Sequence, residues 1–154
     1  IDGVLILMGD PPLNNKPLSP LFPSKVTDEL VKNGYKENIE IYLSVPNNPD
    51  FKKITKKISA SPNGFVTQVI HNYEQADKIY NHLRPKGFDV IPCILFPSNN
   101  NSKSAEFLKL DWSNYKENFT EYVNQIHTLT DDILITSPND FKGALDFFSG
   151  LNLD

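Results

Sequence analysis

The chain has very little cysteine and no long hydrophobic run. Its 154 residues contain a single cysteine, Cys93, so no disulfide can form within the chain and a reducing compartment is expected. No apolar run approaches the roughly 18 residues that a membrane-spanning helix needs, and no signal-peptide pattern is visible. These absences predict a cytoplasmic protein that does not enter a membrane.

An excess of positive charge is also missing. The sequence holds 15 Lys and Arg against 19 Asp and Glu, a net charge of −4. It therefore lacks the excess positive charge that binds the phosphates of a nucleic acid, and no nucleic-acid partner is predicted. The three histidines (His71, His82 and His127) show no metal-ligand spacing. No glycine-rich phosphate loop, nucleophile elbow or Cys-x-x-Cys motif is present. The expected ligand is therefore a small molecule, and Cys93 is expected to be an inert thiol in the core.

What the sequence does contain is a regular alternation of apolar segments. A content of 39% hydrophobic and 11% aromatic residues supports one packed domain over residues 1–154. Buried strands are expected at 1–7, 39–45, 64–70, 88–96 and 132–137. Helices are expected at 24–34, 50–60, 73–83, 112–129 and 139–148. This alternation predicts an α/β fold of parallel βα repeats with five strands.

Several boundaries follow from local chemistry. Ser24 or Thr27 is expected to cap the first helix, and Gly34 to end it. Residues 98–103 are expected to form a loop, followed by a helical turn at 105–110. Pro92 lies inside the fourth strand, where it cannot donate to the ladder, so it requires a strand start or a β-bulge.

Polar residues and prolines follow the ends of most expected strands. Four of the five strands end in such a segment, at residues 9–11, 45–47, 96–98 and 137–139, and the remaining strand carries Thr67 and Gln68. Parallel strands place their carboxyl ends at one rim of the sheet, where α/β folds bind ligands. The sequence therefore predicts a ligand site at this rim.

Four segments of the chain resemble one family of proteins. Three of them contain the strand ends named above, and the fourth includes Gln68. Residues 7–12 (Leu-Met-Gly-Asp-Pro-Pro) resemble the Leu-Arg-Gly-Asp-Pro-Pro strand end of methylenetetrahydrofolate reductases, which are FAD-dependent TIM barrels. Residues 57–68 are similar to that family's Lys-Val-x-Ala-Gly-Ala-Asp-Phe-Ile-Ile-Thr-Gln segment, and residues 87–97 to its Gly-Ile-x-x-Pro-Ile-x-Pro-Gly-Ile-x-Pro strand. Residues 45–49 stand where the family has Tyr-Pro-Glu-Gly-His-Pro. Their order matches the family's fourth to seventh strands, with the last strand as the eighth.

The resemblance implies a fold and a set of site residues. The fold would be a partial or incomplete (β/α)8 TIM barrel, the C-terminal part of a larger barrel; the alternative is an open doubly wound parallel sheet. By resemblance, Asp10 is the catalytic carboxylate and lies beside both flavin and folate, Gln68 contacts the substrate, and Lys56 and Lys57 contact FAD. The implied activity is flavin-dependent hydride transfer to a folate-type one-carbon substrate.

Other positions depart from the family pattern. Met8 replaces an arginine, and Val45 and Asn48 stand where a tyrosine and a histidine contact FAD. No segment corresponds to the first barrel strand, which carries the general-acid glutamate. The second hypothesis is therefore a non-catalytic homologue that binds a small molecule or a partner protein at the carboxyl rim. A third is an unrelated open sheet. Because five strands cannot close an eight-stranded barrel, a homo-oligomer or a missing chain segment is expected to complete it.

Overall fold

The protein is built on five parallel strands arranged in chain order. The computed structural model describes residues 2–8 and 21–150. The strands are β1 (Gly3–Ile6), β2 (Glu40–Val45), β3 (Gly64–Val69), β4 (Asp89–Leu95) and β5 (Leu134–Thr136), and neighbours pair in the order β1-β2-β3-β4-β5. All four pairings are parallel. The predicted α/β fold of parallel βα repeats is confirmed.

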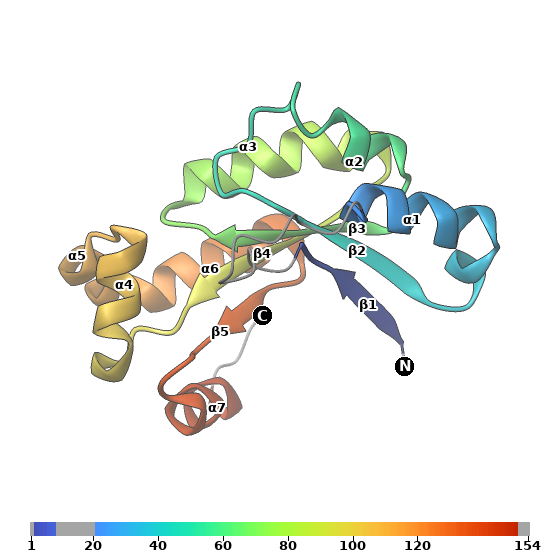
Figure 1. Ribbon diagram of the computed structural model, residues 1–154. Coiled ribbons are helices and arrows are strands. Elements are labelled where there is room, and N and C mark those ends of the chain that lie inside the picture. The colour runs from blue at the N-terminus through green and yellow to red at the C-terminus, as the bar shows by residue number, and fades with distance from the viewer. Residues whose placement is uncertain (1, 9–20, 151–154) are drawn as a thin grey trace, which may run out of the picture.

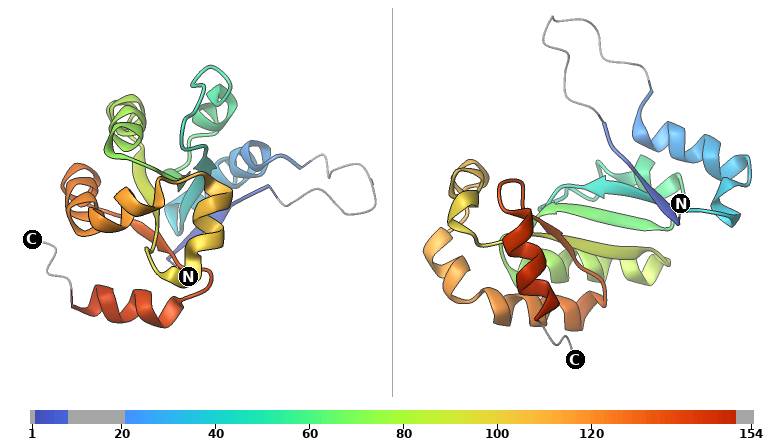
Figure 2. Two further views of the ribbon diagram at one scale, coloured as in Figure 1. Left: turned by 90° about the vertical axis from the view of Figure 1, so that its left-hand side faces the viewer. Right: turned by 90° about the horizontal axis from the view of Figure 1, so that it is seen from below.

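Helices cover the outer face of this sheet. They are α1 (Pro23–Lys32), α2 (Thr55–Ser59), α3 (Tyr73–Leu83), α4 (Ser102–Leu108), α5 (Trp112–Glu117), α6 (Phe119–Thr130) and α7 (Phe141–Ser149). Figure 2 shows α1, α2, α3, α6 and α7 following one another around the convex side of a strongly curled sheet, so that the sheet forms a half-barrel. A doubly wound sheet would reverse its strand order and carry helices on both faces, so that alternative is wrong.

The remaining helices lie beyond the strands. Helices α4 and α5 follow the carboxyl end of β4 (Figure 1). None of the helices within residues 2–8 and 21–150 has both the length and the hydropathy needed to cross a bilayer.

The convex face is apolar because alternate strand residues point toward the helices. Ile6 pairs in register with Leu43, Leu43 with Phe65, and Phe65 with Val90. All four pack in one cluster with residues of α3, including Ile79. Burial of such side chains contributes on the order of 1.5–3 kcal/mol each. The helix layer is therefore held by this row of strand residues.

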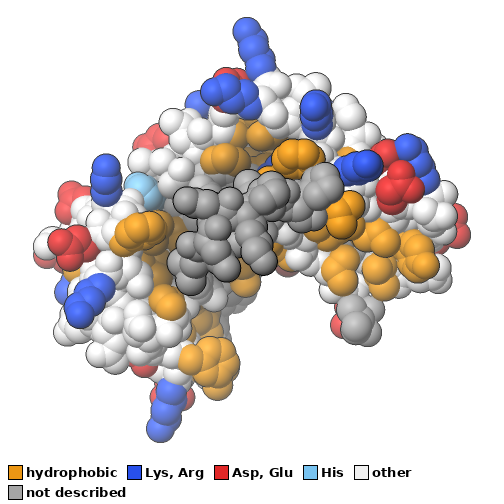
Figure 3. All heavy atoms as spheres, viewed as in Figure 1, with side chains coloured by type: hydrophobic (Ala, Val, Ile, Leu, Met, Phe, Trp, Pro, Cys, Tyr) orange, Lys and Arg blue, Asp and Glu red, His pale blue; other side chains and the backbone are white. Residues whose placement is uncertain are grey.

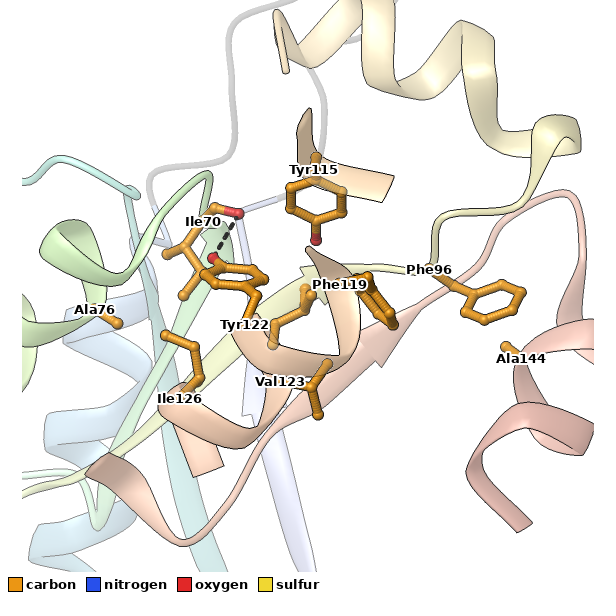
Figure 4. Close-up of a cluster of buried hydrophobic side chains, with 10 residues drawn as sticks. Ile70, Ala76, Phe96, Tyr115, Phe119, Tyr122, Val123, Ile126 and Ala144 are labelled. Carbon is orange, nitrogen blue, oxygen red and sulfur yellow. Dashed lines mark hydrogen bonds between the residues drawn. The ribbon is translucent and has the colours of Figure 1, made fainter. Parts of the chain in front are cut away.

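A second cluster joins α5, α6 and α7 to β4 and β5. Its buried aromatic members are Phe96, Tyr115, Phe119 and Tyr122 (Figure 4). Trp112 packs against this cluster, which confirms that the aromatic residues of 112–129 belong to the core.

Helix α1 begins differently from the sequence prediction. Its N-cap is Phe22, which provides no side-chain hydrogen bond, and Pro23 occupies the first turn. Proline suits this position because its fixed φ is helical and its missing N–H would have no partner there. The predicted caps, Ser24 and Thr27, are wrong because both lie inside the helix. Gly34, with φ of +78°, follows the helix end as predicted.

Three other boundaries also differ. The expected helix at 50–60 is reduced to α2, because the chain forms turns before Thr55. The expected helix at 112–129 is broken at Asn118, whose side chain donates to the Asn114 carbonyl oxygen at 2.9 Å. Such side-chain bonds compete with the helical ladder. The loop expected at 98–103 instead forms a 3-10 turn and the start of α4.

Pro92 lies opposite a β-bulge. The register of β3 and β4 shifts between Val66 and Val69, so that Thr67 and Gln68 oppose Pro92 alone. Next to it, the Thr67 hydroxyl oxygen accepts a hydrogen bond from the Cys93 backbone N–H at 2.9 Å. The requirement for a bulge is confirmed, and burial raises the pKa of the Cys93 thiol to about 11, as expected for an inert core cysteine.

We predict that Gly64→Ala destabilises the sheet. An added Cβ at Gly64 would lie 2.5 Å from the Asp89 carbonyl oxygen, a backbone atom that cannot move without separating β3 from β4. Overpacking of this kind costs about 1–3 kcal/mol in the free energy of unfolding, measurable by urea denaturation. Gly150→Ala is the matched control, because its nearest neighbour would be 3.6 Å away. Equal stability of the two variants would contradict the close approach.

Candidate functional site

The carboxyl ends of β2 and β3 are joined by side-chain hydrogen bonds. The Asn47 amide donates to the Val69 carbonyl oxygen at 3.0 Å and lies 3.3 Å from Nε2 of His71. The His71 backbone N–H donates to the Gln75 side-chain oxygen at 2.7 Å. This part of the rim is therefore fixed between the sheet and the start of α3.

The carboxyl ends of β4 and β5 are joined through one buried amide. Asn101 is completely buried. Its Nδ2 donates to the Phe96 carbonyl oxygen and to the Ser137 hydroxyl, both at 3.0 Å, and its Oδ1 accepts from the Asn139 backbone N–H at 3.1 Å. These bonds satisfy the amide inside the protein. The polar residues at this end of the rim therefore connect two loops.

Asp140 has a similar structural role. Its carboxylate accepts from the Gly143 backbone N–H at 3.0 Å, as the N-cap of α7, and from the Ser98 hydroxyl. The first bond caps α7, and the second ties the start of α7 to the segment after β4.

The structure places Gln68, one of the two residues that the resemblance assigned to the substrate. Gln68 is exposed and lies in the bulge of β3, at the carboxyl rim. Asp10 lies outside the described residues. Whether the two residues share a site therefore stays a prediction.

The two lysines do not lie in one cavity. The Lys57 ammonium donates to the Ser44 carbonyl oxygen of β2 at 2.5 Å, and burial lowers the pKa of Lys57. Lys56 lines a pocket of about 330 Å³ between α1 and α2, together with Lys25 and Asp28. Their predicted role with FAD stays a prediction.

A large groove lies at the carboxyl side of β3, between α3 and α6. It has a volume of about 1050 Å³ and continues into a pocket of about 290 Å³ that reaches His71 and Tyr115. We call the two together the α3–α6 groove. The larger part is lined by hydroxyl, amide and carboxylate side chains: Tyr73, Glu74, Glu117, Asn118, Thr120, Glu121, Asn124, Gln125 and Thr128.

Buried phenols support the inner end of this groove. The Tyr122 hydroxyl donates to the Ile70 carbonyl oxygen at 3.3 Å (Figure 4). The Tyr115 hydroxyl donates to the Leu95 carbonyl oxygen at 3.0 Å and accepts from the Leu95 N–H. Burial raises the pKa of both tyrosines. Their hydroxyls therefore stay protonated and hold α5 and α6 on the sheet.

The electrostatic character of the groove is negative. Glu74, Glu117 and Glu121 line it, and no Lys or Arg side chain does. The salt bridges among the described residues lie elsewhere, at Asp28, Asp50 and Asp89. Carboxylates without a cation nearby favour a positively charged ligand and disfavour a phosphate group.

The donor set does not fit a metal ion. Within the part of the chain that the structure describes, no three His, Cys, Asp or Glu side chains come together as metal ligands. The groove therefore offers hydrogen bonds and negative charge to an organic ligand.

Sequence reasoning missed this groove. It placed the ligand site at the strand ends alone, whereas the groove combines the loop after β3 with the region where α5 ends and α6 begins. Two signals were available: His71 and Asn72 directly follow the third strand, and Asn114 and Asn118 interrupt the apolar spacing of the expected long helix.

No family model matches the chain, and no curated protein matches it. What is established is the class of fold, a parallel α/β half-barrel.

We predict that His71 titrates below its ordinary pKa of 6.5. Partial burial disfavours the charged imidazolium and lowers the pKa of His71. The folded state then binds a proton less readily than the unfolded state, so this group's contribution to stability is present above pH 6.5 and is lost as the pH falls below it. The titration of the His71 ring resonances by NMR measures the midpoint. A midpoint at or above 6.5 would show that the ring is not enclosed as described.

Proposed function

We propose that this chain is a non-catalytic domain that binds a small organic cation in the α3–α6 groove. The observation that carries the proposal is the groove itself: about 1050 Å³ between the start of α3 and the outer side of α6, lined by three carboxylates and no cationic side chain. Its inner pocket reaches His71, which follows the carboxyl end of β3. Ligands of α/β folds usually bind at the carboxyl side of the strands, and few polar groups suffice to orient one.

The groove offers binding groups of two kinds. Glu74 comes from the first turn of α3, and Glu117 and Glu121 come from α5 and α6. The carboxylates therefore face a ligand from two sides. Amide and hydroxyl side chains such as Asn124 and Thr128 supply neutral hydrogen-bond partners beside them. An amine or guanidine group with a short polar body fits this combination.

A binding role agrees with the state of the ionisable groups. The two phenols at the groove are engaged with backbone atoms and have a raised pKa, so neither is available as a base near neutral pH. The one cysteine of the chain is buried, and its pKa of about 11 disfavours the thiolate that a nucleophile requires.

We predict that removing two groove charges weakens binding of cationic probes. Spermidine and agmatine serve as probes, and binding is measured by calorimetry and by chemical-shift changes. Each exposed ion pair contributes about 0.2–1 kcal/mol, so removing two of them with Glu74→Gln and Glu121→Gln should weaken binding about two- to thirtyfold.

The matched control is Glu37→Gln with Glu106→Gln. This double variant removes the same charge at exposed positions that do not line the groove, and it should bind as the unmodified protein does. Equal loss in both double variants, or equal binding of glutarate as an anionic probe, would contradict the proposal.

The second candidate function is a divergent methylenetetrahydrofolate reductase-like activity, with FAD and a folate-type substrate. Its support is that the segments resembling that family fall, in the family's order, on successive βα units of a half-barrel, with Gln68 exposed at the carboxyl rim. A flavin would supply the hydride chemistry, while the chain would position it. This candidate competes with the first because its ligands would bind at Asp10, Gln68, Lys56 and Lys57 and not in the α3–α6 groove.

Flavin retention decides between the two candidates. The reductase-like reading expects the protein to keep FAD after gel filtration, and expects Asp10→Asn to lower that retention without changing the urea midpoint. Lys86→Met, an exposed lysine outside the segments concerned, is the control. Protein that remains colourless after incubation with FAD would eliminate the reductase-like reading and leave the cation-binding proposal intact.

A further inference from the structure

The two outer strands of the sheet each have one unpaired side. The sheet order places β1 and β5 at its ends, and no strand among the described residues pairs with the outer side of either. An open edge exposes backbone N–H and C=O groups that readily pair with another chain. We define the edge surface as the outer sides of β1 and β5 with the exposed apolar residues next to them.

Exposed apolar side chains gather at these edges. Eight of the eleven large hydrophobic residues that are exposed in the described chain lie in or beside β1, at the start of α1, in β5 or on α7: Leu5, Leu7, Met8, Leu21, Phe22, Leu134, Phe141 and Leu145. Figure 3 shows hydrophobic side chains on both arms of the open side of the half-barrel. Large exposed apolar patches mark interaction surfaces.

Hydrogen bonds on the inner sides of β1 and β5 show which backbone groups point to the free side of each strand. The Asp2 carbonyl oxygen accepts from the Glu40 N–H, and the Thr136 carbonyl oxygen accepts from the Phe96 N–H. Backbone groups of successive residues in a strand point to opposite sides. The N–H and C=O of Leu5 and of Ile135 therefore point outward, to the free side of each edge.

We propose that the edge surface binds a second copy of this chain. A two-fold axis parallel to the strands would place β5 of one copy beside β1 of the other, with both strands running in the same direction. The same rotation would place β5 of the second copy beside β1 of the first. The β5–β1 contact would then form twice, and neither copy would keep an unpaired strand edge. Two half-barrels then form a closed parallel barrel of ten strands, five from each copy.

The side-chain alternation of the two edges fits this pairing. Ile135 and Ile6 belong to the helix-covered side of the sheet. Leu134 and Leu5, one residue along each strand, point to the concave side. Pairing β5 with β1 therefore continues an apolar row on each face. Apolar hollows of about 160 Å³ and about 220 Å³ lie at α7 and at α1, the helices next to the two edge strands.

Light scattering and hydrogen exchange test this proposal together. The chain has a mass of 17.4 kDa, and light scattering should report twice that mass at micromolar concentration. In the dimer, the Leu5 and Ile135 amide protons should exchange slowly. Leu134→Lys, which places a charge in the concave row, should give a monomer in which both amides exchange fast while the Ile94 amide, which points to β5, stays protected.

Phe107→Lys is the matched control. Phe107 is 86% exposed on α4 and does not belong to the edge surface, so this variant should remain a dimer. A monomeric unmodified protein would overturn the proposal. So would a dimer that Leu134→Lys leaves intact, or one in which the Leu5 and Ile135 amides exchange freely. Protected edge amides in a monomer would show that another segment, and not a second copy, covers the edges.

Discussion

The architecture depends on the burial of one face of a parallel sheet under helices. A single row of side chains in register, from Ile6 through Leu43 and Phe65 to Val90, packs beneath the helix layer. Because every connection returns over the same face, all strands run in one direction and their carboxyl ends share one rim. Within residues 2–8 and 21–150, no helix packs on the concave face. The position of the groove and of the open edges follows from this one-sided packing.

The polar residues of the rim fall into two groups with different physical roles. Asn101 and Asp140 are hydrogen-bonded to neighbouring loops and hold β4, β5 and α7 together. Removing such a bond leaves a buried polar atom without a partner, which costs about 1–3 kcal/mol. Glu74 and Glu121, by contrast, lie on helices and line a solvent-filled groove, where Glu121 also accepts a hydrogen bond from the Gln125 side chain at 3.1 Å. A polar residue at a strand end whose atoms are all engaged within the protein is therefore no evidence for a ligand.

The two surfaces that the half-barrel exposes are independent. The α3–α6 groove lies on the outer helix layer, where α3 and α6 contact each other, whereas the edge surface belongs to β1 and β5 and the elements beside them. Association through the edges would leave the groove open. A ligand in the groove would contact neither outer strand, so the two proposals can fail separately.

The sequence by itself determined the number and direction of the strands, since continuous apolar runs and βα alternation are local signals. It limited Pro92 to a strand start or a β-bulge, and the structure decided for the bulge, as it decided for the half-barrel order of the strands. Only the tertiary structure decided the break at Asn118, the bond from Lys57 to the Ser44 carbonyl oxygen and the groove between α3 and α6. Each of these depends on distances between segments far apart in the chain, or on competition between nearly equal local bonds, and neither is encoded in a residue pattern.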